Sequence, residues 1–201
     1  MKRPTAQEFG KKYFSSGEAY RDYQVYVRGW TGRVGRKIHT LTKNLDSPTL
    51  LDIGCAHGYL MKEVKETYGM KVAGIEYSSY AYNKRLSSVR SDIKKGDILT
   101  ASFPKNSFDC VVCFDVVEYL TPEENVRAIR SLVRWSRRYI LFTNPYLHSI
   151  NNSQKQNPDP QRITVFSKKE YIRLFYRAGA KLIGHFDGWH GGDILIFQKK
   201  R

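Results

Sequence analysis

Acidic side chains follow three separate apolar runs of this 201-residue sequence, each at a point where a strand is expected to end. Glu76 closes the first of these runs, Asp97 follows the second, and Asp115 and Glu118 follow the last. The carboxyl ends of parallel strands share one edge of an open sheet, and ligands bind along that edge. Any one of these acids is equally well explained as a carboxylate that caps its own loop, but the ordered set indicates a binding site.

A glycine-rich turn precedes these acids, and it indicates a nucleotide-type ligand. The apolar run 49–53 leads into Gly54-Cys55-Ala56-His57-Gly58, after which a helix is expected. Glycines let the backbone approach a ligand closely, and the first amides of a helix meet its polar groups. The turn lacks both the phosphate-loop pattern and the third glycine of the dinucleotide fingerprint, so it is a weak signal alone. Glu76 strengthens it, because a carboxylate about 20 residues further on accepts hydrogen bonds from both ribose hydroxyls and repels a 2′-phosphate.

Alternating strands and helices must position these residues. The first segment, 5–45, carries well-spaced aromatic residues and is predicted to be helical. After it, strands and helices alternate, which predicts an α/β fold with a mostly parallel sheet covered on both faces. A tight glycine-containing turn at 189–192 predicts that the last two strands form an antiparallel hairpin. The expected strands are 49–53, 71–76, 93–98, 108–116, 139–143, 181–187 and 193–199, and the expected helices are 58–68, 78–87, 121–135 and 168–177.

In this order the segments resemble the class I S-adenosylmethionine-dependent methyltransferases, in particular methyltransferase domains of the small-molecule type. Residues 50–60 resemble the first motif of that family, 76–78 its ribose-binding acid, 96–98 its adenine-contacting turn, and 108–120 its fourth strand and following loop. The resemblance implies a Rossmann-like sheet of seven strands, with a methyltransferase domain over 46–201 and an N-terminal helical cap over 1–45. It also implies S-adenosylmethionine as cofactor, held by Asp52, Gly54, Cys55, Ala56, Gly58, Glu76, Tyr77, Asp97, Ile98 and Asp115.

Three positions depart from the family pattern. Ala56 stands where glycine is usual, but it is small enough to keep the close backbone approach. His57 replaces a small hydroxyl residue, and it either touches the methionine part of the cofactor or, as the favoured interpretation, faces solvent. Tyr119 replaces a histidine that often follows the glutamate, which weakens the transfer of a histidine base to this position.

The resemblance implies in-line displacement of a methyl group from a sulfonium ion. A sulfonium is already a good leaving group, so no metal is required, and catalysis comes largely from alignment and desolvation. A base is needed only where the acceptor has a proton to lose. The candidate catalytic residues are His148, Glu118 and Asp115, although an exposed loop histidine is the more ordinary interpretation of His148.

The acceptor is predicted to be a small or sugar-linked molecule. An anionic acceptor is one alternative, with Arg162 placed to meet it, and the polar segment 144–164 is expected to act as a substrate lid. The main alternative is an RNA or DNA methyltransferase, because the formal net charge of +15 comes mainly from the two ends of the chain. Asn144-Pro145-Tyr146 resembles a motif of base-methylating enzymes, but it follows the fifth expected strand instead of the fourth. A binding module that has lost activity is the third hypothesis.

Three cysteines argue against a disulfide framework. Cys110 and Cys113 lie in an apolar run, where residues three apart point to opposite faces of a strand, so they are interpreted as small buried residues. The basic N-terminus is followed by no apolar stretch, and no run approaches the roughly 20 apolar residues of a membrane-spanning helix. These features predict a cytoplasmic protein.

Overall fold

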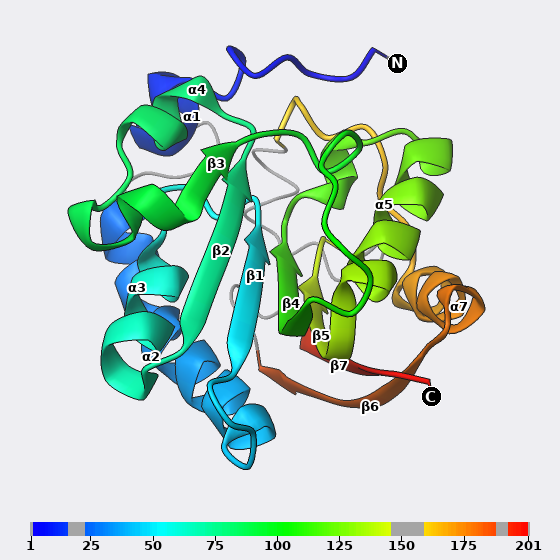
Figure 1. Cartoon of the computed structure of the whole chain (residues 1–201). Coiled ribbons are helices and arrows are strands. Elements are labelled where there is room, and N and C mark those ends of the chain that lie inside the picture. The colour runs from blue at the N-terminus through cyan, green and yellow to red at the C-terminus, as the bar shows by residue number, and fades with distance from the viewer. Residues whose placement is uncertain (1, 16–22, 146–158, 188–192, 201) are drawn as a thin grey trace. The chain divides into compact units, whose positions relative to one another are not determined.

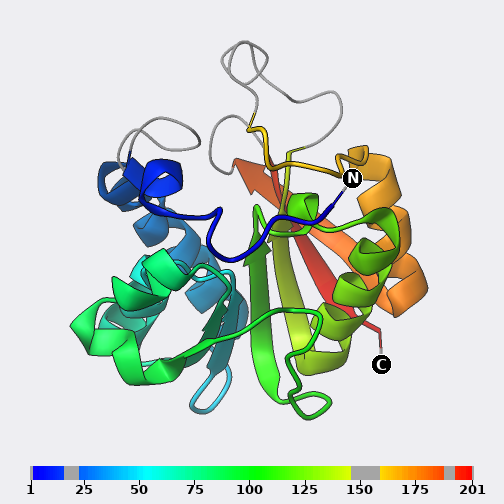
Figure 2. The same ribbon diagram turned by 90° about the horizontal axis from the view of Figure 1, so that it is seen from above.

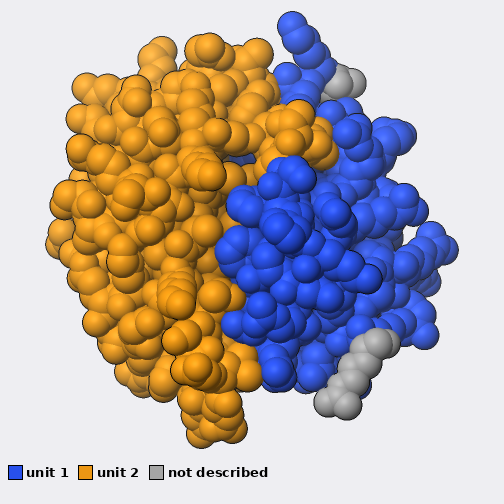
Figure 3. All heavy atoms as spheres, viewed as in Figure 1, with its two compact units in different colours: residues 1–3, 102–201 blue, residues 4–101 orange. Residues whose placement is uncertain are grey.

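The computed structural model of the chain describes residues 2–15, 23–145, 159–187 and 193–200 (Figure 1). The chain forms two compact units, which Figure 3 shows in different colours. The N-terminal unit comprises residues 4–101, and the C-terminal unit comprises residues 102–201 together with 1–3. The expected boundary between a helical cap and a catalytic domain at residue 45 stays a prediction.

The N-terminal unit contains three parallel strands in the order β3-β2-β1. Helices α2 and α3 pack against each other beside these strands (Figure 1). The buried side chains of α3, which are Leu60, Met61 and Val64, recur at the spacing of one helix face. The elements are α1 (Lys11–Ser15), α2 (Tyr23–Thr42), β1 (Thr49–Ile53), α3 (Tyr59–Tyr68), β2 (Lys71–Glu76), α4 (Ser79–Asn83), η1 (Ser87–Asp92) and β3 (Ile93–Lys95).

The C-terminal unit contains four strands in the order β4-β5-β7-β6. Strands β4 and β5 are parallel, whereas β7 runs antiparallel to both β5 and β6, which confirms the expected hairpin. Helices α5 and α7 lie side by side over these strands (Figure 2). The elements are β4 (Phe108–Phe114), η2 (Val117–Tyr119), α5 (Pro122–Trp135), β5 (Ser136–Thr143), α7 (Lys168–Ala178), β6 (Ala180–Asp187) and β7 (Asp193–Lys199).

Helices α5 and α7 begin at capping boxes. The Thr121 hydroxyl accepts a hydrogen bond from the Glu124 amide, and the Glu124 carboxylate accepts one from the Thr121 amide. Ser167 and Glu170 make the same reciprocal pair at the start of α7. Because each box satisfies two amides that a helix start leaves without partners, both helices begin where the sequence predicts.

Strand β4 ends two residues earlier than expected, and two other elements end earlier still. The helix expected through residue 87 stops at Asn83, because the chain then turns back and the Leu86 amide donates to the His57 carbonyl at 3.0 Å. The strand expected through residue 98 stops at Lys95. Its end is set by a turn in which the Asp97 carbonyl accepts the amides of Thr100 and Ala101. Both differences come from hydrogen bonds made by turn residues, which hydrophobic periodicity does not report.

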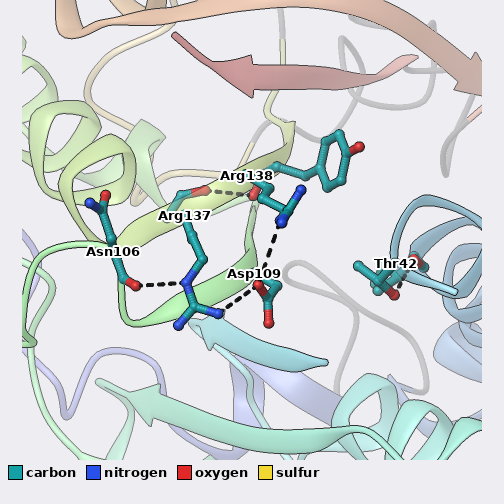
Figure 4. A network of polar contacts seen from close by, with 8 residues as sticks. Thr42, Asn106, Asp109, Arg137 and Arg138 are labelled. Carbon is teal, nitrogen blue, oxygen red and sulfur yellow. Dashed lines mark hydrogen bonds and ion pairs between the residues drawn. The ribbon is translucent and has the colours of Figure 1, made fainter. Parts of the chain in front are cut away.

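A polar network fixes the start of β4 against the start of β5 (Figure 4). Asp109 is buried in β4, and its carboxylate accepts a hydrogen bond from Arg137 Nη1 at 2.9 Å. Arg137 Nε also donates to the Asn106 carbonyl at 3.1 Å, and Arg138 Nε lies 4.0 Å from the same carboxylate. The buried charge of Asp109 is therefore matched by two cations that remain half exposed to water.

Cys110 and Cys113 are buried, as the sequence predicts. Both are thiols within β4, and Cys55 is a buried thiol in the glycine turn. Among the described residues, no group of three or more His, Cys, Asp and Glu side chains is arranged to hold a metal ion. No helix in the described part of the chain has the length and apolarity needed to cross a membrane.

Candidate functional site

The glycine turn after β1 is held in an unusual backbone conformation by its own hydrogen bonds. Gly54, Ala56 and Gly58 have positive φ angles of 72°, 49° and 87°, respectively. The Gly54 amide donates to the Ile75 carbonyl at 2.9 Å, and the Gly58 amide donates to the Cys55 carbonyl at 2.8 Å. A positive φ suits glycine and is costly for residues with a Cβ, so Ala56 is held there by its surroundings.

Glu76 provides part of those surroundings. Its Oε2 accepts a hydrogen bond from the Ala56 amide and its Oε1 accepts one from the Ser78 amide, both at 2.6 Å. The side chain is buried, and burial raises the pKa of Glu76 to about 7 against the opposing effect of these amide hydrogen bonds. The acid at the end of β2 is thus attached directly to the glycine turn that ends β1.

A second buried carboxyl group lies in the same unit. Asp52, the fourth residue of β1, is buried, and burial raises its pKa to about 7, with a further contribution from the charge of Glu76. Burial also raises the pKa of the Cys55 thiol, and the charges of Asp52 and Glu76 add to that shift. The turn is therefore an acidic environment, suited to a ligand that donates hydrogen bonds.

The other predicted cofactor residues of the N-terminal unit lie in two turns. Asp97 Oδ1 accepts the Leu99 amide at 2.9 Å, which fixes the carboxylate beside the buried side chain of Ile98. Tyr77 follows β2, and its ring makes an edge contact with Phe9, the two centroids lying 6.1 Å apart. The acid can accept hydrogen bonds from an amino group, and the apolar side chain beside it can cover the flat face of a ring.

His57 is buried, so the interpretation that it faces solvent is wrong. Four aromatic rings of the N-terminal unit lie around the imidazole, with centroids 5.2 to 6.3 Å from its own. Burial first, and the charge of Lys84 second, lower the pKa of His57 to about 4, and its Nε2 has no hydrogen-bond partner among the described residues. The rings belong to Phe14, Tyr23, Tyr59 and Tyr80.

In the C-terminal unit, Asp115 and Glu118 follow β4. Asp115 has a positive φ of 51°, and its amide donates to the Thr143 carbonyl at 3.0 Å. Glu118 is buried, and its Oε1 lies 3.2 Å from Nε of Arg162. Burial raises the pKa of Asp115 to about 7 and that of Glu118 to about 8, while the charge of Arg162 acts against both shifts. The structure thus brings together two of the predicted catalytic residues and the predicted anion-binding arginine.

Backbone hydrogen bonds hold Arg162 in this position. The amides of Ile163 and Thr164 both donate to the Glu118 carbonyl, at 2.8 and 2.9 Å. The Thr164 hydroxyl donates to the Leu120 carbonyl at 2.6 Å. The described end of the segment 144–164 is therefore attached to the loop that follows β4.

Four further residues of this unit make side-chain hydrogen bonds, and none of them was predicted as a site residue. Asn144 is buried after β5, and its Nδ2 donates to the Tyr171 hydroxyl at 2.9 Å. The Tyr119 hydroxyl donates to Asp159 Oδ2 at 2.7 Å. The sequence signal for Asn144 was the motif Asn144-Pro145-Tyr146 after the fifth expected strand. Tyr171 had no such signal, because its position in the helix fits that of an apolar residue.

His148, the remaining predicted catalytic residue, lies outside the described residues, as do most of the predicted lid and the turn 188–192. The placement of these three features therefore stays a prediction.

A family model described as a methyltransferase domain matches residues 23–185. The phosphoethanolamine N-methyltransferase of Plasmodium falciparum is 27% identical over 131 residues, which are 63% of this chain and 44% of that protein. A sterol 24-C-methyltransferase of Gibberella zeae is 29% identical over 120 residues, which are 54% of this chain and 29% of that protein. The chain thus matches less than half of the length of either relative.

Two solved structures share the fold of this chain. The PH0226 protein from Pyrococcus horikoshii OT3 has a TM-score of 0.69 at 16% identity, over 96% of this chain and 98% of that one. Magnesium protoporphyrin IX methyltransferase from Synechocystis PCC 6803 with bound SAH has a TM-score of 0.68 at 15% identity, over 88% and 87%. The predicted seven-stranded, mostly parallel Rossmann-like sheet with an antiparallel C-terminal hairpin is confirmed. The family match and the fold together identify the chain as a member of the methyltransferase-domain family, the class I S-adenosylmethionine-dependent methyltransferases.

Proposed function

We propose that this chain transfers the methyl group of S-adenosylmethionine to a small or sugar-linked acceptor. The observation that carries the proposal is the buried Glu76 carboxylate. It accepts hydrogen bonds from the amide of Ala56 in the glycine turn and from the amide of Ser78 in the loop after β2. A carboxylate fixed in this way at the end of β2 is placed to accept hydrogen bonds from two neighbouring ribose hydroxyls. Membership of the methyltransferase family supports S-adenosylmethionine as the molecule that carries this ribose.

Each predicted cofactor residue then has a defined task. The backbone of the turn approaches the donor, and a Cβ on Gly58 would lie 2.7 Å from Val89 Cγ2, so no larger residue fits there. Asp97 would accept the adenine amino group and Ile98 would cover the ring. Tyr77 would flank the donor, and Asp115 is the predicted cofactor residue of the C-terminal unit. The remaining turn residues are Asp52, Gly54, Cys55 and Ala56, which would shape the wall of the site.

The reaction itself asks little of the protein. The acceptor's electron pair attacks the methyl carbon, the carbon–sulfur bond breaks, and its electron pair returns to sulfur, giving S-adenosylhomocysteine. Alignment and exclusion of water account for most of the acceleration. Where the acceptor must lose a proton, Glu118 and Asp115 are suited to accept it, because their raised pKa values of about 8 and about 7 lie near neutral pH.

An anionic acceptor is disfavoured. The expectation rested on Arg162, whose side chain is only 13% exposed and whose Nε is already paired with the Glu118 carboxylate. An anion would have to displace that carboxylate, leaving Glu118 buried without its cation, which is costly.

Binding of the donor tests the proposal. We expect isothermal titration calorimetry to show that S-adenosylmethionine binds, and that Glu76→Gln weakens binding by about 10-fold or more, since two ribose hydrogen bonds to a charged group are lost. Glu66→Gln is the matched control, because Glu66 is exposed on α3 of the same unit. Absence of any heat of binding to the folded wild-type protein would refute the proposal.

Methylation of nucleic acid remains the alternative, and one surface favours it. Helix α2 contains no acidic residue, and Arg28, Arg33 and Arg36 are exposed on it. A basic helix of this kind attracts phosphates, although it is also typical of a solvated helix face. Retention of radiolabelled RNA on filters at low salt, lost at higher salt and in the triple variant Arg28→Gln, Arg33→Gln, Arg36→Gln, would support this alternative. We expect no retention at either salt concentration.

A further inference from the structure

A cluster of acidic side chains in the C-terminal unit carries more carboxyl groups than cations. Asp115, Glu118 and Asp159 act electrostatically on one another, and among the described residues Arg162 is the cation that acts on them. Arg162 Nε is bonded to Glu118 Oε1, and Tyr119 donates its hydroxyl to Asp159. One guanidinium among three carboxyl groups leaves up to two negative charges unbalanced when all three are ionised.

Several buried polar atoms of this unit lack a hydrogen-bond partner among the described residues, and two of them belong to residues that follow β4 and β5. These two are Glu118 Oε2, on a side chain that is 1% exposed, and Asn144 Oδ1, on a side chain that is 2% exposed. The Asp115 amide bonds to the carbonyl of Thr143, the residue before Asn144, so Asp115 and Asn144 leave the two paired strands β4 and β5 side by side. Burying an acceptor atom without a donor is costly, and both atoms call for a ligand that donates hydrogen bonds.

We infer that this cluster, defined by Asp115, Glu118, Asn144 and Asp159, binds the methyl acceptor through an amino group, taken up as its ammonium ion. The inference rests on the proposed function and names the class of acceptor. An ammonium ion supplies what the cluster lacks, because it brings one positive charge and several N–H donors. A carboxylate or phosphate would be repelled by the excess of acid, and a hydroxyl would bring a single donor and no charge.

The same residues suit the steps that an amine requires. An ammonium nitrogen has no electron pair with which to attack, so it must first pass one proton to a carboxylate, which becomes a carboxylic acid. The neutral amine then attacks the methyl carbon, the carbon–sulfur bond breaks towards sulfur, and the nitrogen becomes a methylated ammonium ion. The thioether product is neutral, so the positive charge of the sulfonium ends on the acceptor nitrogen. Burial raises the pKa of Glu118, and this makes it a better proton acceptor than an ordinary carboxylate.

Calorimetry on the protein saturated with S-adenosylhomocysteine tests the inference with three probes of matched size. These are ethanolamine, its neutral analogue ethylene glycol and its anionic analogue glycolate. We expect ethanolamine to bind at least about 10-fold more tightly than either analogue. Attraction between its positive charge and the carboxylates of a partly desolvated site is large enough to give this ratio. We expect Glu118→Gln to remove that preference, while Glu123→Gln, an exposed acid at the start of α5, leaves it unchanged.

The two proposals fail in different ways. If S-adenosylhomocysteine binds and ethanolamine does not, or binds no better than ethylene glycol or glycolate, the inference about the amine is overturned and the proposed function stands. If S-adenosylhomocysteine itself does not bind to the folded protein, the proposed function fails. Asp115→Asn provides a second variant should Glu118→Gln not fold, and retention of the full preference for ethanolamine in either folded variant overturns the inference.

Discussion

Glu76 is kept ready for a ligand by the backbone around it. Each carboxylate oxygen already accepts one amide hydrogen bond, and an ionised carboxylate offers about four lone-pair positions in all. Lone pairs therefore remain for ribose hydroxyls without any rearrangement of the turn. Since the two amides belong to Ala56 and Ser78, the acid also joins the two loops that we propose to lie against the donor.

Gly58 is required by both its backbone angle and its packing. Its φ is 87°, and an added Cβ would lie 2.7 Å from Val89 Cγ2 and 2.8 Å from Ile93 Cδ1. We expect Gly58→Ala to lower the free energy of unfolding by about 2–4 kcal/mol, the sum of a left-handed backbone penalty and overpacking. Urea unfolding followed by circular dichroism measures the change.

Gly69 offers a matched control for this substitution. It also has a positive φ, of 65°, but an added Cβ would meet nothing within 4 Å. We expect Gly69→Ala to cost only the backbone penalty, about 1 kcal/mol. Equal losses in the two variants would show that contacts with Val89 and Ile93 do not matter.

At the scale of elements, local signals predicted most of the structure. Thr121 and Ser167 mark the starts of α5 and α7, and both capping boxes form. Short apolar runs between turn residues located β1 and β2 at the expected bounds, because such runs bury on both faces of a parallel sheet. The last two strands pair as expected, because the chain between them is too short for any connection except a hairpin.

What the sequence could not predict depends on contacts between distant residues. The burial of His57 requires Phe14 and Tyr23, which lie more than 30 positions earlier in the chain in both cases. The pairing of Arg162 with Glu118 joins residues 44 positions apart. Arg162 was expected to meet an anionic acceptor, but its guanidinium is paired with an acid of the protein itself. Neither partner was available from spacing or periodicity, which describe only one element at a time.

At the scale of the whole molecule, the raised pKa values make stability depend on pH. Asp52, Glu76 and Asp115 titrate near 7 and Glu118 near 8 in the folded chain, whereas they ionise near pH 4 when unfolded. Between these limits the folded chain holds protons that the unfolded chain has released, so stability falls as pH rises. His57 acts oppositely, because its lowered pKa makes stability rise with pH, but only up to about 6.5, its unfolded value.

Among the described groups with shifted pKa values, these carboxyl groups set the slope between pH 6.5 and 8. We expect the free energy of unfolding to fall by on the order of 2 kcal/mol between pH 6.5 and 8 in the absence of ligand. Urea titrations at several pH values in this range measure it. Glu118→Gln removes one of the groups and should flatten the slope, and a stability that stays constant or rises over the same range would contradict the assignment of these shifts.

Strand β7 lies between β5 and β6, although it follows both of them in the chain. During synthesis, β5 and the helix α5 that packs on it emerge from the ribosome well before β7, their neighbour on that side, exists. Because translation proceeds at roughly 5–20 residues per second, the exposed edge of β5 persists for several seconds in a nascent chain. Residues 193–199 thus decide when the second half of the protein stops being a target for chaperones and for aggregation.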